Sequence, residues 1–331
     1  MGRLLPLVTM AAAALLAACG GGSTDTPADG STTSSPGPAD TSSAAAATAP
    51  YVEVDAGPVG TTSADGAVWV VSSGSDQVSR IPVGATEPDL VVDVPGTPLR
   101  AVADGGAVWV TAFRGEQLLR VDAASGEVTD TIDTGAGPEG VTAGFGSIWL
   151  VEQDAGRLVR IDPGTGKVAD RIDIGVGSRL VAAGTDAVYV AAFADDRLLR
   201  VDPTSLEVTR SPRLCSGPQG MVELGGRLWV ACTFADRVVA VDPATLRRTA
   251  AVPVEGLPDS VVAHDGRLLV LAEEGPRLVV VDPDAAEVTD EVVLGEETAL
   301  YDSANLDLTV AGGEAWVTSF KADRVYHVPV P

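Results

Sequence analysis

The sequence is poor in the residues that most often carry catalysis or bind transition metals. Its 331 residues include only two histidines, His264 and His327, and three cysteines. It has no HExxH motif, no cysteine pair at zinc-binding spacing and no glycine-rich phosphate-binding loop. These absences predict a protein with no catalytic residue of the usual types, no metal site and no cofactor.

Positive charge is also scarce. The 22 basic residues are outnumbered by 46 acidic ones, which gives a formal net charge of −24. Nucleic acids and anionic membrane surfaces attract proteins rich in Lys and Arg. The balance therefore excludes nucleic acid as the main partner, and we expect a soluble monomeric body whose partner lies elsewhere.

One long hydrophobic run is present, at the N-terminus. Leu4 to Ala18 is apolar, follows Arg3 and ends in the segment LAAC, which closes with Cys19. Fifteen residues are too few to span a bilayer comfortably and are typical of a signal peptide. Small residues before a cysteine resemble the lipobox of bacterial lipoproteins, which implies lipidation of Cys19 after cleavage. The alternative is an ordinary signal peptide with an incidental cysteine.

The next segment has almost no large apolar side chains. Residues 20–50 consist mainly of Gly, Ser, Thr, Ala, Pro and Asp. Such a composition cannot repay the entropy of folding. We predict a signal peptide at 1–18, the lipidated Cys and a disordered tether at 19–50, and a folded domain at 51–331. The predicted location is the cell membrane, facing outward.

The rest of the chain is a sevenfold repeat. An aromatic or leucine marker recurs in equivalent contexts, spaced by 40 residues five times and then by 47. Each unit contains four short apolar strands separated by turn residues, which is the pattern of a propeller blade. The markers are Trp69, Trp109, Trp149, Tyr189, Trp229, Leu269 and Trp316.

The two ends of the repeat region complement each other. The last unit stops at RVYHVPVP without a fourth strand, and the first unit is preceded by an extra strand, YVEVDAGP. Pairing residues 51–55 with 324–329 would remove an exposed sheet edge. The predicted fold is therefore all-β: a seven-bladed β-propeller of four-stranded blades, closed by the N-terminal strand, which completes the last blade.

The units resemble the YVTN and NHL-type seven-bladed propellers, the superfamily that includes streptogramin lyase and lactonase-like enzymes. The resemblance covers residues 51–331. It implies a ligand site on the upper face, where the first strand of each blade begins and the second ends. Lyases of this type are expected to use upper-face histidines, a carboxylate and a divalent cation. His264 lies in a turn predicted on the opposite face, so the chain departs from that pattern.

Three repeated columns are interpreted as structural. An Asp column at the turn between third and fourth strands should accept local backbone hydrogen bonds. An Arg column ending in His327 should pack its stems on the surface. Four phenylalanines near the ends of the second strands should form a belt between blades. The Asp column is Asp122, Asp162, Asp202, Asp242 and Asp282; the Arg column is Arg80, Arg120, Arg160 and Arg200; the phenylalanines are Phe113, Phe193, Phe234 and Phe320.

Candidate ligand-binding residues lie where the repeat varies. The column at the entrance of the first strand runs Val59, Leu99, Glu139, Arg179, Gln219, Asp259 and Leu306, and Arg100 follows it. A longer loop, residues 295–307, adds Glu296, Glu297, Tyr301, Asp302 and Asn305. Long loops often bind ligands. We predict that the polar members of both sets surround the mouth of the central channel. The alternatives are a tolerant, water-filled mouth and a surface insertion without function.

The remaining cysteines predict a disulfide. Cys215 enters the fifth marker unit, and Cys232 ends its second strand, in an oxidising compartment. A hairpin turning at Gly225–Gly226 places Cys232 opposite Gln219, so the loop has to curl back four residues to reach it.

Three functions remain open from sequence. The first is a lipid-anchored extracytoplasmic propeller that binds a protein, peptide or glycan of the cell envelope. The second is a divalent-cation-dependent lyase or lactonase-like hydrolase at the same channel mouth. Its Ca²⁺ or Mg²⁺ ligands would be oxygen atoms of Glu139, Asp259, Asp302 and Asn305. The third is an envelope spacer without a ligand.

Overall fold

A computed structural model describes residues 48–296 and 306–330 of the protein. The predicted signal peptide and Cys19 lie outside the described residues, as do residues 20–47 of the tether. Tyr301, Asp302 and Asn305 also lie outside them, together with Glu297. Within the described ranges, no helix has the length and apolarity of a membrane span.

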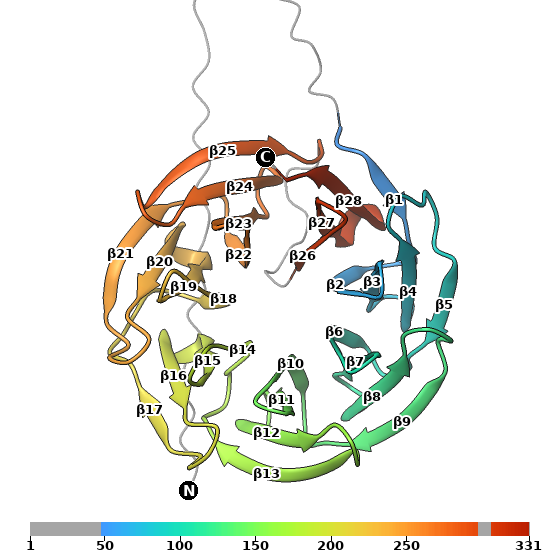
Figure 1. Cartoon of the computed structure of the whole chain (residues 1–331), viewed down its shortest axis with the longest axis horizontal. Coiled ribbons are helices and arrows are strands. Elements are labelled where there is room, and N and C mark those ends of the chain that lie inside the picture. The colour runs from blue at the N-terminus through green and yellow to red at the C-terminus, as the bar shows by residue number, and fades with distance from the viewer. Residues whose placement is uncertain (1–47, 297–305, 331) are drawn as a thin grey trace, which may run out of the picture. The chain divides into compact units, whose positions relative to one another are not determined.

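The folded unit is an all-β seven-bladed propeller, which confirms the predicted fold class. Seven four-stranded antiparallel sheets surround a common axis (Figure 1). In six of them the strands follow one another in chain order from the axis outward. Short strands connected by tight turns form because Gly and Asp-Gly pairs interrupt each apolar run at regular intervals.

The strand bounds follow the predicted repeat. Blade 1 contains β2 (Pro58–Ala64), β3 (Ala67–Ser72), β4 (Gln77–Pro82) and β5 (Leu90–Asp93). Blade 2 contains β6 (Pro98–Asp104), β7 (Ala107–Ala112), β8 (Gln117–Asp122) and β9 (Val128–Asp133). Blade 3 contains β10 (Pro138–Gly144), β11 (Ser147–Glu152), β12 (Arg157–Asp162) and β13 (Lys167–Asp173). Blade 4 contains β14 (Val181–Ala183), β15 (Val188–Ala192), β16 (Arg197–Val201) and β17 (Val208–Arg210).

The last three blades have the same organisation. Blade 5 contains β18 (Pro218–Leu224), β19 (Arg227–Cys232), β20 (Arg237–Val241) and β21 (Arg248–Pro253). Blade 6 contains β22 (Pro258–His264), β23 (Arg267–Ala272), β24 (Arg277–Asp282) and β25 (Glu287–Val293). Blade 7 contains β26 (Leu308–Ala311), β27 (Glu314–Ser319), β28 (Arg324–Pro329) and β1 (Tyr51–Glu53). Single 3₁₀ turns follow three of the second strands: η1 (Phe193–Asp195), η2 (Thr233–Ala235) and η3 (Phe320–Ala322).

Strand β1 forms the outer edge of the sheet that contains the C-terminal strand β28. Tyr51 lies opposite Tyr326, Val52 opposite Val325 and Glu53 opposite Arg324. The pairing spans three residues, which is shorter than the expected 51–55. Contacts begin before the strand, because the buried Ala49 donates its N–H to the Leu294 carbonyl at 2.9 Å.

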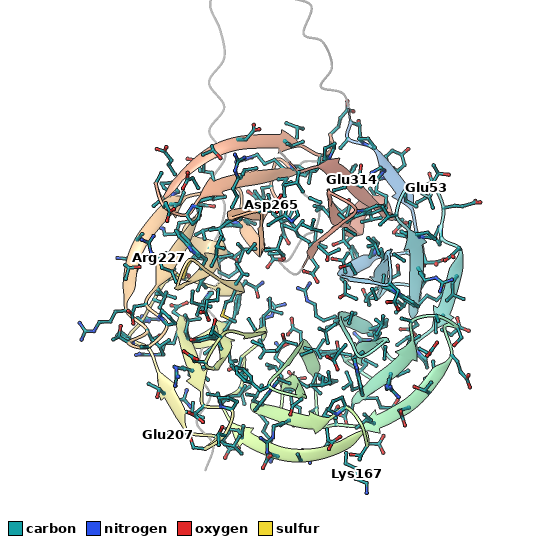
Figure 2. All side chains as sticks on the ribbon, viewed as in Figure 1. Glu53, Lys167, Glu207, Arg227, Asp265 and Glu314 are labelled. Carbon is teal, nitrogen blue, oxygen red and sulfur yellow. A yellow bond between two sulfur atoms is a disulfide. The ribbon has the colours of Figure 1, made fainter. Side chains whose placement is uncertain are left out.

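The core lies between adjacent blades. All the aromatic markers are buried, and so is Leu269 in blade 6. Because each sheet is covered on both faces by its neighbours, its central strands are buried at every position, as in β3 and β7. The fourth strands lie on the outside of the ring and carry charged residues; Figure 2 shows Lys167 and Glu207 pointing away from it.

Five of the innermost strands carry an irregularity at one position. In blade 5, Pro218 lies opposite Cys232 and Met221 opposite Val230, so Gln219 and Gly220 together face one residue of β19. The same register shift occurs at the start of β2, β6, β10 and β22. Such a β-bulge changes the direction in which the side chains around it point.

Candidate binding site on the upper face and in the channel

Two faces of the propeller are defined by its loops. The upper face contains the loops that enter the first strands and the loops that follow the second strands, including η1, η2 and η3. The lower face contains the hairpins between first and second strands and the turns between third and fourth strands.

The structure places the predicted entrance column at the top of the channel but buries most of it. Glu139 is 1% exposed, and Gln219 and Asp259 are both 0% exposed. Of its four polar members, Arg179 alone is partly exposed, with 16% of its side chain accessible. This burial speaks against the alternative of a tolerant, water-filled mouth, and the ligand-binding role of these residues stays a prediction.

The bulge is the physical reason. In blades 2, 3, 5 and 6 it lies at the column residue and the residue after it, so the column side chain packs between blades and the next residue lines the channel. Sequence reasoning assigned the mouth to a position one residue too early. The neighbouring column, which lies at the channel, is Gly60, Arg100, Gly140, Leu180, Gly220, Ser260 and Asp307.

Adjacent members of the entrance column interact directly. Arg179 Nη2 lies 2.9 Å from Glu139 Oε1, and its Nε lies 3.1 Å from the same oxygen. A planar guanidinium held by two contacts to one carboxylate is the strong form of this ion pair. Blades 3 and 4 are thus joined by a largely buried charge pair at the top of the channel.

A pair of buried carboxyl groups lies on the other side of the channel. The Leu306 N–H donates to Asp259 Oδ2 at 2.6 Å and lies 3.3 Å from Glu273 Oε1. Burial raises the pKa of Asp259, against the opposing effects of Arg100 and Glu273. Asp259 therefore favours its neutral form more than an exposed aspartate does.

Both polar atoms of the buried Gln219 side chain have unmet hydrogen-bonding capacity. Neither its Nε2 nor its Oε1 has a hydrogen-bond partner among the residues that the structure describes. Buried amides are normally satisfied, so each exception requires an explanation. It lies between the blades that contribute Arg179 and Asp259.

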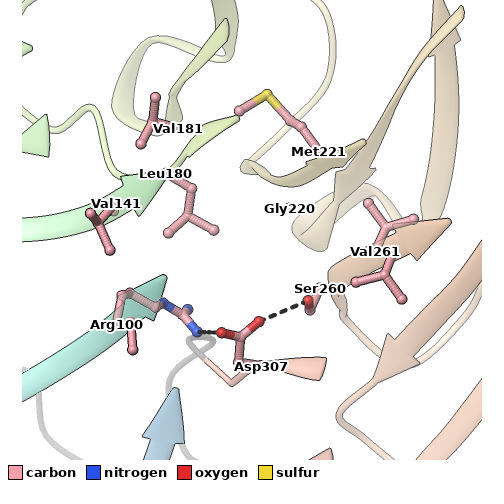
Figure 3. Close-up of a pocket in the computed structure, with 12 residues that line it drawn as sticks. Arg100, Val141, Leu180, Val181, Gly220, Met221, Ser260, Val261 and Asp307 are labelled. Carbon is pink, nitrogen blue, oxygen red and sulfur yellow. Dashed lines mark hydrogen bonds and ion pairs between the residues drawn. The ribbon is translucent and has the colours of Figure 1, made fainter. Parts of the chain in front are cut away.

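The channel wall carries a second network, formed by Arg100, Asp307 and Ser260. Arg100 Nη1 lies 3.4 Å from Asp307 Oδ2 and also donates to the Leu306 carbonyl at 3.1 Å. Ser260 Oγ donates to Asp307 Oδ1 at 3.1 Å. These contacts connect blades 2, 6 and 7 (Figure 3). Of the three residues, sequence analysis identified Arg100 alone.

This network forms one side of a cavity of about 150 Å³ in the channel. The other labelled side chains around the cavity are aliphatic: Val141, Leu180, Val181, Met221 and Val261 (Figure 3). None of these five was predicted as a site residue. In the repeat alignment, Leu180 follows the entrance column by one residue and the other four follow it by two. Extending the column search by two positions would have found them.

The upper face also carries an exposed aromatic pair. Phe193 and Phe234 pack edge to face, with ring centroids 5.6 Å apart, and Phe234 is 57% exposed. The Arg179 guanidinium lies 5.0 Å from the Phe193 ring centroid. These two phenylalanines come from neighbouring blades and form one contact of the predicted four-residue belt. The exposed Val176 belongs to the adjoining loop, where Ala194 N–H donates to the Gly177 carbonyl at 3.2 Å.

Cys215 and Cys232 form a disulfide beneath this surface, with Cα atoms 5.9 Å apart. The bulge sets Cys232 opposite Pro218, not opposite Gln219 as an unbroken hairpin would. The loop from Cys215 therefore has less distance to cover than a regular register implies.

The Asp and Arg columns have the structural roles expected of them. In each turn the Asp Oδ1 accepts the N–H groups two and three residues later; for Asp202 both distances are 2.8 Å. These backbone hydrogen bonds lower the pKa of Asp202 and of Asp282. Arg120 lies over the buried Trp109 ring at 5.6 Å, and His327 stacks on Trp316 with centroids 4.8 Å apart.

The two histidines lie away from the upper-face loops. His264 ends β22 on the lower face, 3.6 Å from Asp265, and His327 lies within β28. Within residues 48–296 and 306–330, no three His, Cys, Asp or Glu side chains cluster as metal ligands would.

Comparisons with known proteins support the fold. The chain is similar to streptogramin B lyase, with a TM-score of 0.73 and 15% identity over 84% of this chain and 96% of that one. A catalytically inactive virginiamycin B lyase from Staphylococcus aureus, solved with quinupristin, gives 0.74 and 17% over 85% and 99%. BamB from Moraxella catarrhalis gives 0.59 and 16% over 82% and 82%.

At these identities the similarity shows the propeller fold alone, in agreement with the predicted streptogramin lyase-like fold. No protein-family model matches the sequence, and a search of curated proteins gave no match.

Proposed function

We propose that this protein is a lipid-anchored extracytoplasmic propeller that binds a peptide segment of an envelope protein through its upper face. One observation carries the proposal: Phe234 is 57% exposed beside Phe193, on the face where Arg179 reaches the channel mouth. Exposed aromatic rings next to an arginine are typical of interaction surfaces.

The shape and polarity of this surface favour a peptide over a glycan. Phe193 and Phe234 form an apolar strip of two rings packed edge to face, and the exposed Val176 belongs to another loop of the same face. Aliphatic and aromatic side chains of a peptide can cover such a strip.

Site-specific photocrosslinking tests this proposal. A photoreactive phenylalanine analogue at position 234 should give a discrete adduct in intact cells, identified by mass spectrometry. The matched control is position 145, because Phe145 is also exposed but lies in a hairpin of the lower face. Equal adducts at both positions, or none at 234, would contradict upper-face binding.

The proposed anchor rests on Arg3, the apolar run 4–18 and Cys19. The wild-type protein should fractionate with membranes, whereas Cys19→Ser should be released or remain unprocessed. Mass spectrometry of the mature N-terminus measures the lipid directly. A soluble, unlipidated wild-type protein would contradict the anchor. The crosslinking experiment tests upper-face binding independently of this result.

A metal-dependent lyase is the second candidate, favoured by the fold similarity to virginiamycin B lyase solved with quinupristin. Incubation with quinupristin and Mg²⁺ tests it directly. Conversion of quinupristin that is abolished by a chelator would replace the binding proposal with the enzymatic one.

A further inference from the structure

We propose that the channel cavity is a second binding site, distinct from the upper face, for small neutral molecules. Its ligands would have a branched aliphatic part and one hydrogen-bond donor, as aliphatic primary amides and alcohols do. Three observations support this site: the aliphatic side chains around the cavity, its polar side chains, and a second hollow that adjoins it.

The aliphatic wall sets the size and apolarity of the ligand. Val141, Leu180, Val181, Met221 and Val261 surround a volume of about 150 Å³. Apolar cavities of that size in proteins hold molecules of about six to eight non-hydrogen atoms, such as benzene. Branched chains suit this wall because their shape matches the Val and Leu methyl groups that form it.

The polar wall excludes charged ligands. Asp307 Oδ1 accepts from Ser260 Oγ and from Leu308 N at 2.9 Å. Its Oδ2 accepts from Thr61 N at 3.2 Å and lies 3.4 Å from Arg100 Nη1. The carboxylate is therefore neutralised and its acceptor sites are filled. A ligand ammonium or carboxylate would have to break this network.

Ser260 supplies the remaining polar contact. Its hydroxyl proton is directed to Asp307, which leaves the Oγ lone pairs as acceptors at the edge of the cavity. A ligand must therefore donate a hydrogen bond at this point. This requirement selects amides and alcohols over ethers, ketones and simple hydrocarbons.

The cavity continues toward the lower face. Below it, a second hollow of about 420 Å³ shares Val181 and Met221 with the cavity and extends to the lower-face residues Thr185 and Glu223. A ligand reaches the channel from this side without passing the proposed peptide surface.

Methionine labelling gives a direct probe of occupancy. The three methionines are Met1, Met10 and Met221, and of these Met221 alone belongs to the propeller. In full-length protein labelled with ¹³C at the methionine methyl, 4-methylpentanamide should shift the Met221 signal saturably. An eight-atom ligand supports a Kd of about 1–10 mM. The matched anion 4-methylpentanoate should bind about tenfold more weakly, and acetamide, which lacks the tail, should cause no saturable shift.

Two substitutions locate the site. Ala101→Leu fills the cavity from β6 and should abolish the shift, whereas Ala103→Leu, two residues further along the same strand and outside the cavity, should leave it unchanged. Ser260→Ala removes the acceptor and should weaken amide binding about fivefold.

Three results would overturn the proposal: no saturable Met221 shift, a carboxylate bound as tightly as the amide, or binding unchanged by Ala101→Leu. The comparison of amide and carboxylate uses wild-type protein, so it stands even where a variant fails to fold. Crosslinking from position 234 should persist in Ala101→Leu, because the upper-face site does not depend on the channel.

Discussion

At the residue scale, the buried Asp259 has an electrostatic cost that depends on pH. Its folded-state pKa is raised by burial from an ordinary value of 3.8. The folded state therefore binds a proton more tightly than the unfolded state. As a result, the free energy of unfolding falls as pH rises from the ordinary pKa through the raised one.

We expect Asp259→Asn, which mimics the neutral acid, to melt at a higher temperature than wild type at pH 8. The difference should shrink as the pH falls and vanish below the ordinary pKa of 3.8. Thermal melts across this range provide the measurement. A gap between the two proteins that does not change with pH would contradict the raised pKa.

Asp202→Asn is the control of opposite sign. Backbone hydrogen bonds from Ser205 and Thr204 lower the pKa of Asp202, so its contribution is present above the ordinary pKa and is lost as pH falls through the lowered one. Its variant should be the less stable protein at pH 7 and should converge with wild type in acid.

A glycine at the channel imposes a steric limit. A Cβ at Gly220 would lie 2.6 Å from the Asp259 carbonyl and 2.9 Å from Ser260 Cα, both in the next blade. Gly220→Ala should lower the free energy of unfolding by about 1–3 kcal/mol, because rigid backbone has to move.

Gly164→Ala is the matched control for this substitution. Its nearest neighbour would be a side-chain oxygen of Asp162 at 3.3 Å, in an exposed turn. Denaturant titration of both variants measures the difference, and equal losses would show that blade spacing is not the cause.

At the element scale, the disulfide ties the loop before β18 to the end of β19. It closes a loop with a sequence separation of 17, which corresponds to about 3 kcal/mol in the chain-entropy treatment. On a Cys19→Ser background, native protein should show no reactive thiol, and reduction should lower the melting temperature. The double variant Cys215→Ser with Cys232→Ser should be insensitive to reductant; two titratable thiols without reductant would contradict the bond.

Repetition explains what could be predicted about the elements. Asp242 and its equivalents recur because each turn needs the same acceptor, so one copy predicts the others. The buried Trp markers recur because every blade interface needs the same packing. A physical requirement that repeats every 40 residues leaves a visible column.

The candidate site could not be predicted to the residue, because the bulge leaves no mark in composition. Gln219 and Gly220 look like consecutive strand residues, yet they share one partner on β19. Because of the bulge, the residue expected to line the channel is buried between blades, and the residue after it lines the channel. Asp307 was missed for another reason: its partners Thr61 and Arg100 lie more than 200 residues away in the chain.

At the scale of the whole molecule, the outer edge of blade 7 depends on β1. Val52 is buried there, and three residues pair with β28. Deleting residues 51–53 should lower the free energy of unfolding by roughly 3 kcal/mol or more, since it exposes apolar surface and a sheet edge.

Deleting residues 20–47 serves as the comparison, because it removes a longer segment with no predicted contact to the propeller. This deletion should leave the melting temperature within a degree or two of wild type. Equal melting temperatures for the two deletions would mean that β1 contributes nothing to the ring.

The column of residues at the channel, Gly60 to Asp307, alternates between glycine and larger residues from blade to blade. Blades 1, 3 and 5 place glycine there, and blades 2, 4 and 6 place Arg100, Leu180 and Ser260. Each glycine makes room for the backbone of the next blade; a Cβ at Gly60 or Gly140 would lie within 2.5 Å of it. An even ring could continue this alternation without a break, but seven cannot be divided into pairs. One mismatch is unavoidable, and it falls at Asp307, beside Ser260. The odd number of blades therefore sets two larger residues side by side, and here both are polar and joined by the hydrogen bond from Ser260 Oγ to Asp307 Oδ1.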